Sequence, residues 1–210
     1  MNVFLCLLMG YPIAYIMARA KEKTQKTMMT LIMIPMWMNF LIRTYAWMTI
    51  LQDTGIINGV LGAIGIEPIH VIGTETAVII GMVYDYSPYM VLPIYSILAK
   101  LDIRLLEAAR DLGCNGASVL RRVVFPLSVP GVISGVTMVL IPSISTFYIS
   151  QKLGGTDTVL IGDVIERQFK QGNNPNLGAA LSLVLMILVF ICTGIMNRFG
   201  GGNEEGGVIV

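Results

Sequence analysis

Two ionisable residues, Arg43 and Asp85, lie inside long apolar stretches of the sequence. A charged side chain in such surroundings is costly, so it is by default a functional candidate with a nearby partner. At 1.5 Å per helical residue, both would lie roughly 12 to 14 Å below the expected external ends of their stretches. The matching depth predicts a salt bridge across a helix bundle, in which an incoming ammonium group competes for Asp85. Alternatively, Arg43 snorkels outward and Asp85 only hydrogen-bonds to a neighbouring helix.

Aromatic residues surround these two charges along the chain. Tyr45, Tyr86 and Tyr89 are each within four positions of Arg43 or Asp85. Aromatic rings attract ammonium groups by cation–π interactions of roughly 0.5 to 2 kcal/mol, which makes the three tyrosines candidates for lining a cation pathway. Aromatic residues near span ends are also common interfacial anchors, and that interpretation stays open.

The third feature with chemical order is a polar insert at residues 100–126, KLDIRLLEAARDLGCNGASVLRRVVFP. Asp102 is a candidate N-cap, and Gly113 is placed to end the helix in a left-handed conformation. A second helix is expected to restart near Ser118. The pattern predicts a helix-turn-helix outside the bilayer, whose small residues and fixed Glu107 charge suit docking into a groove. The alternative is an amphipathic helix on the lipid surface. The expected apolar face consists of Leu105, Leu106, Ala109 and Leu112.

The composition indicates which elements position these residues. The chain has 210 residues, of which 55% are hydrophobic and 13% are charged, and its mean hydropathy is +0.74. These values are typical of a multi-span membrane protein, in which each helix needs about 20 apolar residues. The predicted fold class is an all-α transmembrane bundle forming one domain, 1–198, followed by a cytoplasmic tail, 199–210. The expected spans are 1–18, 28–51, 76–98, 127–149 and 178–197.

Lys and Arg predict the topology, because cytoplasmic loops hold the excess of positive charge. The connection after the first span and the insert at 100–126 are both basic, so both are expected in the cytoplasm. The connection at 52–75 has no Lys or Arg, and the one at 150–177 is charge-balanced, so both are expected outside. The chain enters its first span without a preceding basic segment, which argues against a cleavable signal. We expect that a further span precedes it.

The sequence offers no motif for catalysis or cofactor binding. It has no G-x-x-x-x-G-K-S/T phosphate loop, no H-E-x-x-H and no G-x-S-x-G, and His70 is its single histidine. Cys6, Cys114 and Cys192 do not form a disulfide or metal-ligand pattern and are expected to be packing residues. We therefore expect no metal, no cofactor and no enzymatic activity, and any ATP would be hydrolysed by another chain.

The fourth expected span contains a G-x-x-x-G pair, Gly131 and Gly135. This spacing lets two membrane helices approach closely. The neighbour is expected to be either another helix of this chain or a second subunit. Pro126, Pro130 and Pro142 in the same segment favour a kinked span, although prolines are also common in membrane helices.

The insert resembles the "EAA" signature of ABC importer permeases: Glu107-Ala108-Ala109, then Gly113, then Val123, Phe125 and Pro126. The resemblance extends over most of the chain to the PotB-type permeases of spermidine/putrescine importers. That family normally has six spans, so the five seen here are a departure from its pattern. The resembling stretches are 34–51, 89–98, 107–113, 126–135 and 152–165.

The resemblance implies a MetI-like permease fold and a transport subunit without its own ATP site. It implies a bacterial cytoplasmic membrane protein that forms the translocation path for polyamines. The implied partners are cytoplasmic ATPase subunits, a second permease subunit, an extracytoplasmic binding protein and the lipid bilayer, with no nucleic acid. The implied coupling residues are Glu107, Ala108, Ala109, Asp111 and Gly113.

Two other function classes fit the sequence less well. A secondary transporter or channel for a small cation is the alternative, and inverted repeats would favour it, but none is visible. An intramembrane enzyme ranks last, because no nucleophile–base pair or metal dyad is present.

Overall fold

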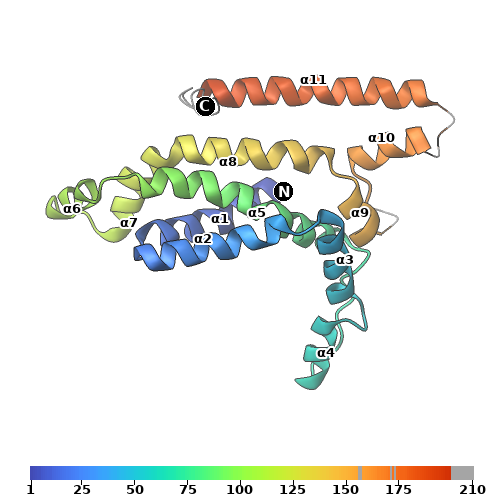
Figure 1. Cartoon of the computed structure of the whole chain (residues 1–210), viewed down its shortest axis with the longest axis horizontal. Helices are drawn as coiled ribbons and strands as arrows, with labels where there is room; N and C mark the ends of the chain where they lie inside the picture. Colours follow the sequence, from blue (N-terminus) through green and yellow to red (C-terminus); the bar gives the residue numbers. More distant parts are fainter. Residues whose placement is uncertain (156–157, 171, 173, 200–210) are drawn as a thin grey trace.

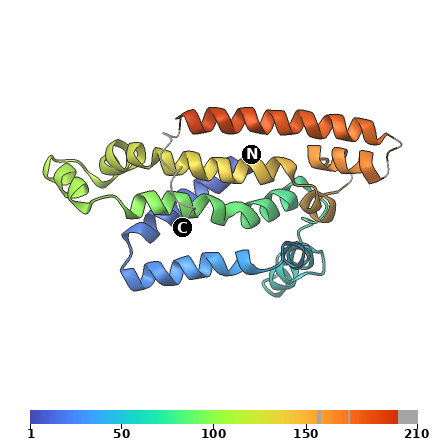
Figure 2. The same ribbon diagram turned by 45° about the horizontal axis from the view of Figure 1, so that its top comes forward.

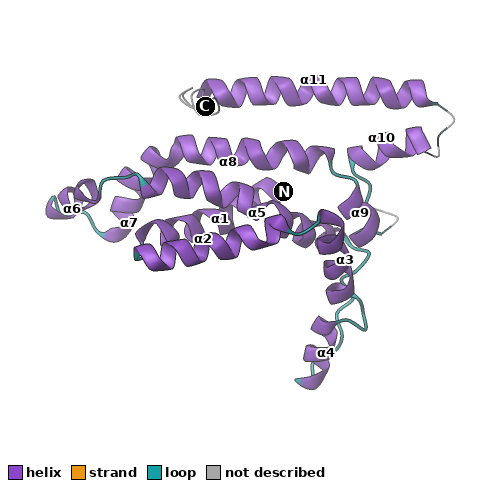
Figure 3. Ribbon diagram, in the orientation of Figure 1, coloured by secondary structure: helices purple, strands orange, loops and turns teal. Residues whose placement is uncertain are grey.

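A computed structural model describes residues 1–155, 158–170, 172 and 174–199. Over these residues the chain consists of helices and connecting loops, without a β-strand (Figures 1 and 3). The prediction of an all-α bundle is therefore confirmed. The expected cytoplasmic tail lies outside the described residues, apart from its first position.

Four helices are long and apolar enough to cross a membrane: Asn2–Arg19, Glu75–Ala99, Gly116–Ser145 and Pro175–Met196. Of the shorter helices that connect them, Glu22–Trp37 runs along the bundle beside Asn2–Arg19, and the others lie at the two ends (Figure 1). The bounds are α1 Asn2–Arg19, α2 Glu22–Trp37, α3 Phe40–Leu51, α4 Ile56–Ala63, α5 Glu75–Ala99, α6 Ile103–Asp111, α7 Gly116–Val119, a π-helical turn Leu120–Val124, α8 Phe125–Ser145, α9 Tyr148–Leu153, α10 Ile161–Lys170 and α11 Pro175–Phe199.

The expected span at 28–51 is wrong as a single helix. α2 ends at Trp37, Met38 is extended, and the side chain of Asn39 accepts a hydrogen bond of 2.8 Å from the Leu41 N–H to cap α3. Pro35 contributes to the break because it has no N–H for the helical ladder. After the break, α3 turns away from α2 toward α4 (Figures 1 and 2). The expected span at 127–149 likewise ends earlier, at Ser145, and α9 begins after a break.

Helix α5 is the centre of the bundle and packs against both α1 and α8. The two glycines of the G-x-x-x-G pair lie at the α5–α8 contact. A Cβ atom on Gly131 would lie 3.0 Å from the Pro93 carbonyl oxygen and 3.2 Å from the Ile94 Cα. A Cβ atom on Gly135 would lie 3.1 Å from the Met90 carbonyl oxygen. The close neighbour of this pair is therefore α5 of the same chain.

This contact predicts that Gly131→Ala destabilises the bundle by about 1 to 3 kcal/mol, because the added methyl group overpacks a helix–helix contact. Gly194→Ala is the matched control, since a Cβ atom at Gly194 in α11 meets nothing described within 4 Å. Thermal unfolding of the purified protein in detergent measures both. Equal midpoints for the two variants would contradict the α5–α8 contact.

The connections separate into two groups at opposite ends of the bundle. At one end, the Tyr95 hydroxyl near the end of α5 donates a hydrogen bond of 3.3 Å to Gln25 near the start of α2. At the other end, the Gly73 N–H donates to the Leu153 carbonyl oxygen at 2.8 Å, which joins the loop before α5 to the end of α9. Figure 2 shows the α1–α2 turn at the same end as α6. This alternation matches the topology predicted from Lys and Arg, while the assignment of sides stays a prediction.

Candidate functional site

The two ionisable residues of the apolar stretches meet inside the bundle. Nη1 of Arg43 in α3 lies 3.3 Å from Oδ1 of Asp85 in α5, and the side chains are only 9% and 2% exposed. Among the described residues, neither Nε of Arg43 nor Oδ1 of Asp85 has a hydrogen-bond partner. The pairing predicted from their matching depth is present, and Arg43 does not snorkel outward. Its role in transport stays a prediction.

The three candidate tyrosines occupy different surroundings. Tyr86, next to Asp85, is buried, and its hydroxyl donates a hydrogen bond of 3.4 Å to the Pro142 carbonyl oxygen in α8. Tyr45 and Tyr89 are exposed. One of the three tyrosines therefore lies beside the buried ion pair and two lie at the surface of α3 and α5. Together they do not line a single enclosed pathway.

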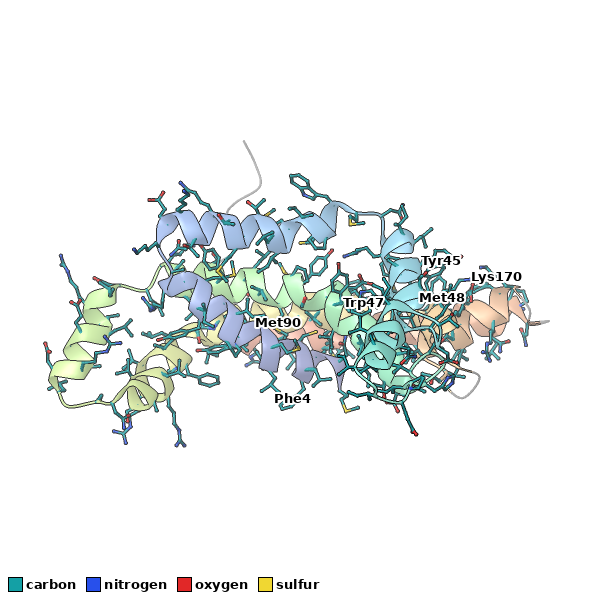
Figure 4. All side chains as sticks on the ribbon, turned by 90° about the horizontal axis from the view of Figure 1, so that it is seen from below. Phe4, Tyr45, Trp47, Met48, Met90 and Lys170 are labelled. Carbon is teal, nitrogen blue, oxygen red and sulfur yellow. The ribbon has the colours of Figure 1, made fainter. Side chains whose placement is uncertain are left out.

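Two further residues, Tyr148 and Lys152 of α9, were missed by the sequence analysis. The Tyr45 ring meets the Tyr148 ring edge-on at 6.4 Å, and Lys152 lies over both rings. Trp47 contacts Tyr84 of α5 at 5.2 Å instead, so Tyr45 and Trp47 leave α3 toward different helices (Figure 4). The i, i+4 spacing of Tyr148 and Lys152 was the available signal, because residues so spaced share a helix face.

The polar insert forms the predicted short helix, α6, with the predicted signals at both ends. The Asp102 side chain accepts a hydrogen bond of 2.9 Å from the Arg104 N–H. Gly113 has a φ of +83°, a left-handed conformation that glycine adopts at little cost. The second helix starts earlier than Ser118, because Asn115 caps α7 by accepting a 2.8 Å hydrogen bond from the Ser118 N–H.

The apolar face of α6 is narrower than expected. Leu106 and Ala109 are buried, but Leu105 is exposed and Leu112 is 86% exposed. Helix α6 packs mainly against α7 and the π-helical turn, and most of its side chains stay exposed among the residues that the structure describes. We define the outer face of α6 by the exposed residues of the helix and of the position after it: Ile103, Arg104, Leu105, Glu107, Ala108, Arg110, Asp111 and Leu112.

A continuous helical rod joins α6 to the bundle. α7, the π-helical turn and α8 follow one another without a break from Gly116 to Ser145. Pro126 has no N–H, so the regular ladder is interrupted near it, and the Phe125 N–H donates to the Leu120 carbonyl oxygen in a π-turn. This rod therefore extends from the residues that α6 contacts to the α5–α8 contact.

The described part of the chain holds no group of three His, Cys, Asp or Glu residues that could bind a metal ion. The three cysteines are free thiols, with Cys6 buried and Cys114 and Cys192 partly buried.

Comparison with known families decides between the function classes. Residues 10–200 match the family model described as "Binding-protein-dependent transport system inner membrane component". The chain belongs to this family. It is a multi-pass membrane protein and a transport subunit, as the resemblance of the insert to the EAA signature predicted. The intramembrane-enzyme interpretation is therefore rejected.

Individual relatives agree with this assignment. The chain is 44% identical, over 92% of its length, to the spermidine/putrescine transport system permease protein PotB of Haemophilus influenzae, and 41% identical, over 88% of its length, to PotB of Escherichia coli K12. It spans 68% of each of these relatives, and 65% of PotB of Salmonella typhimurium, to which it is also 41% identical. The predicted family resemblance is confirmed.

Solved structures show the same fold. The chain resembles a subunit of a bacterial ABC transporter that imports alginate, with a TM-score of 0.76 and 18% identity over 95% of this chain and 75% of that one. It also resembles the MetNI methionine ABC transporter in an inward-facing conformation, with a TM-score of 0.66 and 20% identity over 95% of this chain and 88% of that one. The predicted MetI-like permease fold is confirmed.

Proposed function

We propose that the chain is the permease subunit of an ATP-driven importer for polyamines, spermidine and putrescine, in the bacterial cytoplasmic membrane. The observation that carries the proposal is the 44% identity to a spermidine/putrescine permease over 92% of the chain. The whole importer would contain two cytoplasmic ATPase subunits, a second permease subunit and an extracytoplasmic binding protein.

The outer face of α6 is the proposed docking surface for the ATPase. It combines exposed apolar side chains and the small Ala108 with charges of both signs, from Glu107, Asp111, Arg104 and Arg110. Exposed apolar residues clustered at a tip away from the spans favour a protein partner. Together with Ala109 and Gly113, these residues form the proposed coupling site, and the rod through α8 carries its movement into the bundle.

The opposite end is the proposed entry side, where α3, α4, α9 and α10 gather (Figure 1). A polyamine delivered there would meet Tyr45 at the surface before the buried pair, whereas Tyr89 lies four residues beyond Asp85 toward the opposite end of α5. Because Asp85 is buried and Arg43 is its only described charged partner, an incoming ammonium group can take the place of Arg43 at the carboxylate, and the displaced guanidinium then has to move from the bundle toward solvent on its long side chain. We propose that this exchange, next to Tyr86, opens the pathway.

Uptake in a strain without its own polyamine importers tests this function. Cells that express the chain with its partner subunits should accumulate labelled putrescine or spermidine in a saturable manner, and depletion of ATP should stop the accumulation. The uncharged isostere 1,4-butanediol should neither enter nor compete. Uptake that survives loss of nucleotide would favour a secondary transporter, and competition by the diol would contradict cation recognition.

A further inference from the structure

An ammonium group already occupies an aromatic site at the proposed entry side. Nζ of Lys152 lies 5.4 Å from the Tyr45 ring centroid and 5.8 Å from the Tyr148 ring centroid. The two rings approach edge-on at 6.4 Å with an interplanar angle of 77°. Phe40 adds a third ring, 5.9 Å from that of Tyr148. The group is assembled from two helices, α3 and α9, that are distant in sequence.

This geometry selects for a cation. An ammonium group within about 6 Å of a ring centroid is attracted by the negative face of the ring. The two tyrosines place Lys152 in that range at once, whereas a neutral amine or alcohol would gain no comparable attraction. Because Tyr45 is 45% exposed, the site opens to the outside of the helices.

The backbone around the site is held in place. The carbonyl oxygen of Leu153, the residue after Lys152, accepts the hydrogen bond from the Gly73 N–H at 2.8 Å. Leu153 itself is buried, and a Cβ atom on Gly81 of α5 would lie 2.5 Å from its Cδ1. The Lys152 side chain, by contrast, is only partly buried. The backbone of α9 next to Lys152 is thus anchored, while the ammonium group lies at the end of a flexible side chain.

The charge distribution favours cations at this end. The connection between α3 and α5 carries Asp53, Glu67 and Glu75 and has no Lys or Arg between residues 52 and 75. The connection at 150–177, at the same end, is charge-balanced, so this end keeps a net negative charge, which raises the local concentration of cations. Tyr45 is also two residues from Arg43 on α3, so the aromatic site lies about 3 Å along the helix axis from the buried ion pair, on a different face of the helix.

We propose that Tyr45 and Tyr148 form a binding site for a primary alkylammonium group of the substrate, and that Lys152 is a tethered occupant which the substrate displaces. The identity of the substrate rests on the proposed function; the ligand class rests on the site. Exchange of one ammonium group for another keeps the local charge unchanged. The displaced lysine turns to solvent on its four-carbon stem.

The proposal predicts that Lys152→Met opens the site to free amines. A tethered ligand competes at an effective concentration in the millimolar range, so its removal should lower the midpoint of binding about tenfold, which is about 1.4 kcal/mol. Lys152→Arg keeps a cation at the same position and is the matched control. It should leave the midpoint near that of the parent protein.

Fluorine NMR measures the midpoint of amine binding directly. Tyr148 is replaced by 3-fluorotyrosine in the full chain, which is purified together with the subunits that remain bound to it. The probe is 1,4-diaminobutane at constant ionic strength. In Lys152→Met the resonance should shift saturably with the lower midpoint. The shift should persist with Tyr45→Phe and vanish with Tyr45→Leu. A flat response in Lys152→Met, an unchanged midpoint, or the same shift with sodium chloride would overturn the proposal.

This readout needs neither transport nor ATP, so it separates the site from the proposed function. If the importer does not carry polyamines, putrescine uptake is absent in every variant while the fluorine titration still saturates. If only the aromatic site is wrong, uptake continues in Lys152→Met with the parental KM and the resonance does not respond.

Discussion

An Arg43→Met variant is expected to lose putrescine uptake and about 3 to 5 kcal/mol of unfolding free energy, because the change leaves a buried carboxylate without its counter-ion. Asp85 is 2% exposed, and Oδ1 has no hydrogen-bond partner among the described residues. Denaturant unfolding in detergent gives the free energy, and uptake of labelled putrescine gives the activity. The exposed pair of Lys26 and Glu22, at 2.7 Å, supplies the control: Lys26→Met should change stability little.

The double variant Arg43→Met/Asp85→Leu distinguishes structural pairing from transport. Removing both charges together avoids the unpaired group, so most of the lost stability should return. Uptake should not return, because the proposed exchange needs the carboxylate. A double-mutant cycle reports the coupling between the two residues. Additive losses of stability would contradict the pairing, and normal uptake in the double variant would remove the pair from the pathway.

The second large effect is expected at α6. Glu107→Lys and Gly113→Pro should leave the protein in the membrane but abolish the stimulation of ATP hydrolysis by the loaded binding protein. Glu107 is exposed in this chain, so reversing its charge disturbs a partner rather than the fold. Gly113 has a φ of +83°, whereas proline fixes φ near −65°, so the turn after α6 would be redirected. Steady-state ATPase assays on the reconstituted importer measure the loss.

The control for this turn is Gly113→Asn, because asparagine enters the left-handed region more readily than other residues. A Cβ atom at this position meets nothing described within 4 Å, so the control adds no clash. Most of the stimulation should therefore remain in Gly113→Asn. Full stimulation in both Glu107→Lys and Gly113→Pro would show that α6 does not couple to the ATPase.

Sequence signals located α6 because its start and end depend on short-range chemistry. Asp102 caps the helix two residues away, and Gly113 ends it with its own backbone freedom. The break between α2 and α3 has equally local causes in Pro35 and Asn39, but the apolar run across them resembles one span. The mean hydropathy of a segment reports how apolar the segment is. It does not reveal a capped turn that divides an apolar segment into two helices.

Only some of the tertiary contacts could be predicted from the sequence. The Arg43–Asp85 pair followed from depth, because two opposite charges at one level of a bundle need each other. The site around Lys152 could not be predicted from depth, because Tyr45 and Tyr148 come into contact only through the packing of α3 against α9. Periodicity also predicted too wide a buried face for α6. It shows which apolar residues share one side of the helix, but the packing against α7 determines which of them are buried. Here Leu106 is buried and Leu112 is not.

The most direct test of a cytoplasmic coupling helix is site-specific crosslinking from Ala108→Cys, compared with Gly59→Cys in α4 at the opposite end, both in a Cys114→Ser background. Both positions are exposed. We expect a short crosslinker on Ala108→Cys to capture the ATP-hydrolysing subunit, and a membrane-impermeant maleimide added to intact cells to label Gly59→Cys alone. Labelling of Ala108→Cys from outside, with no capture of the ATPase, would contradict the central claim.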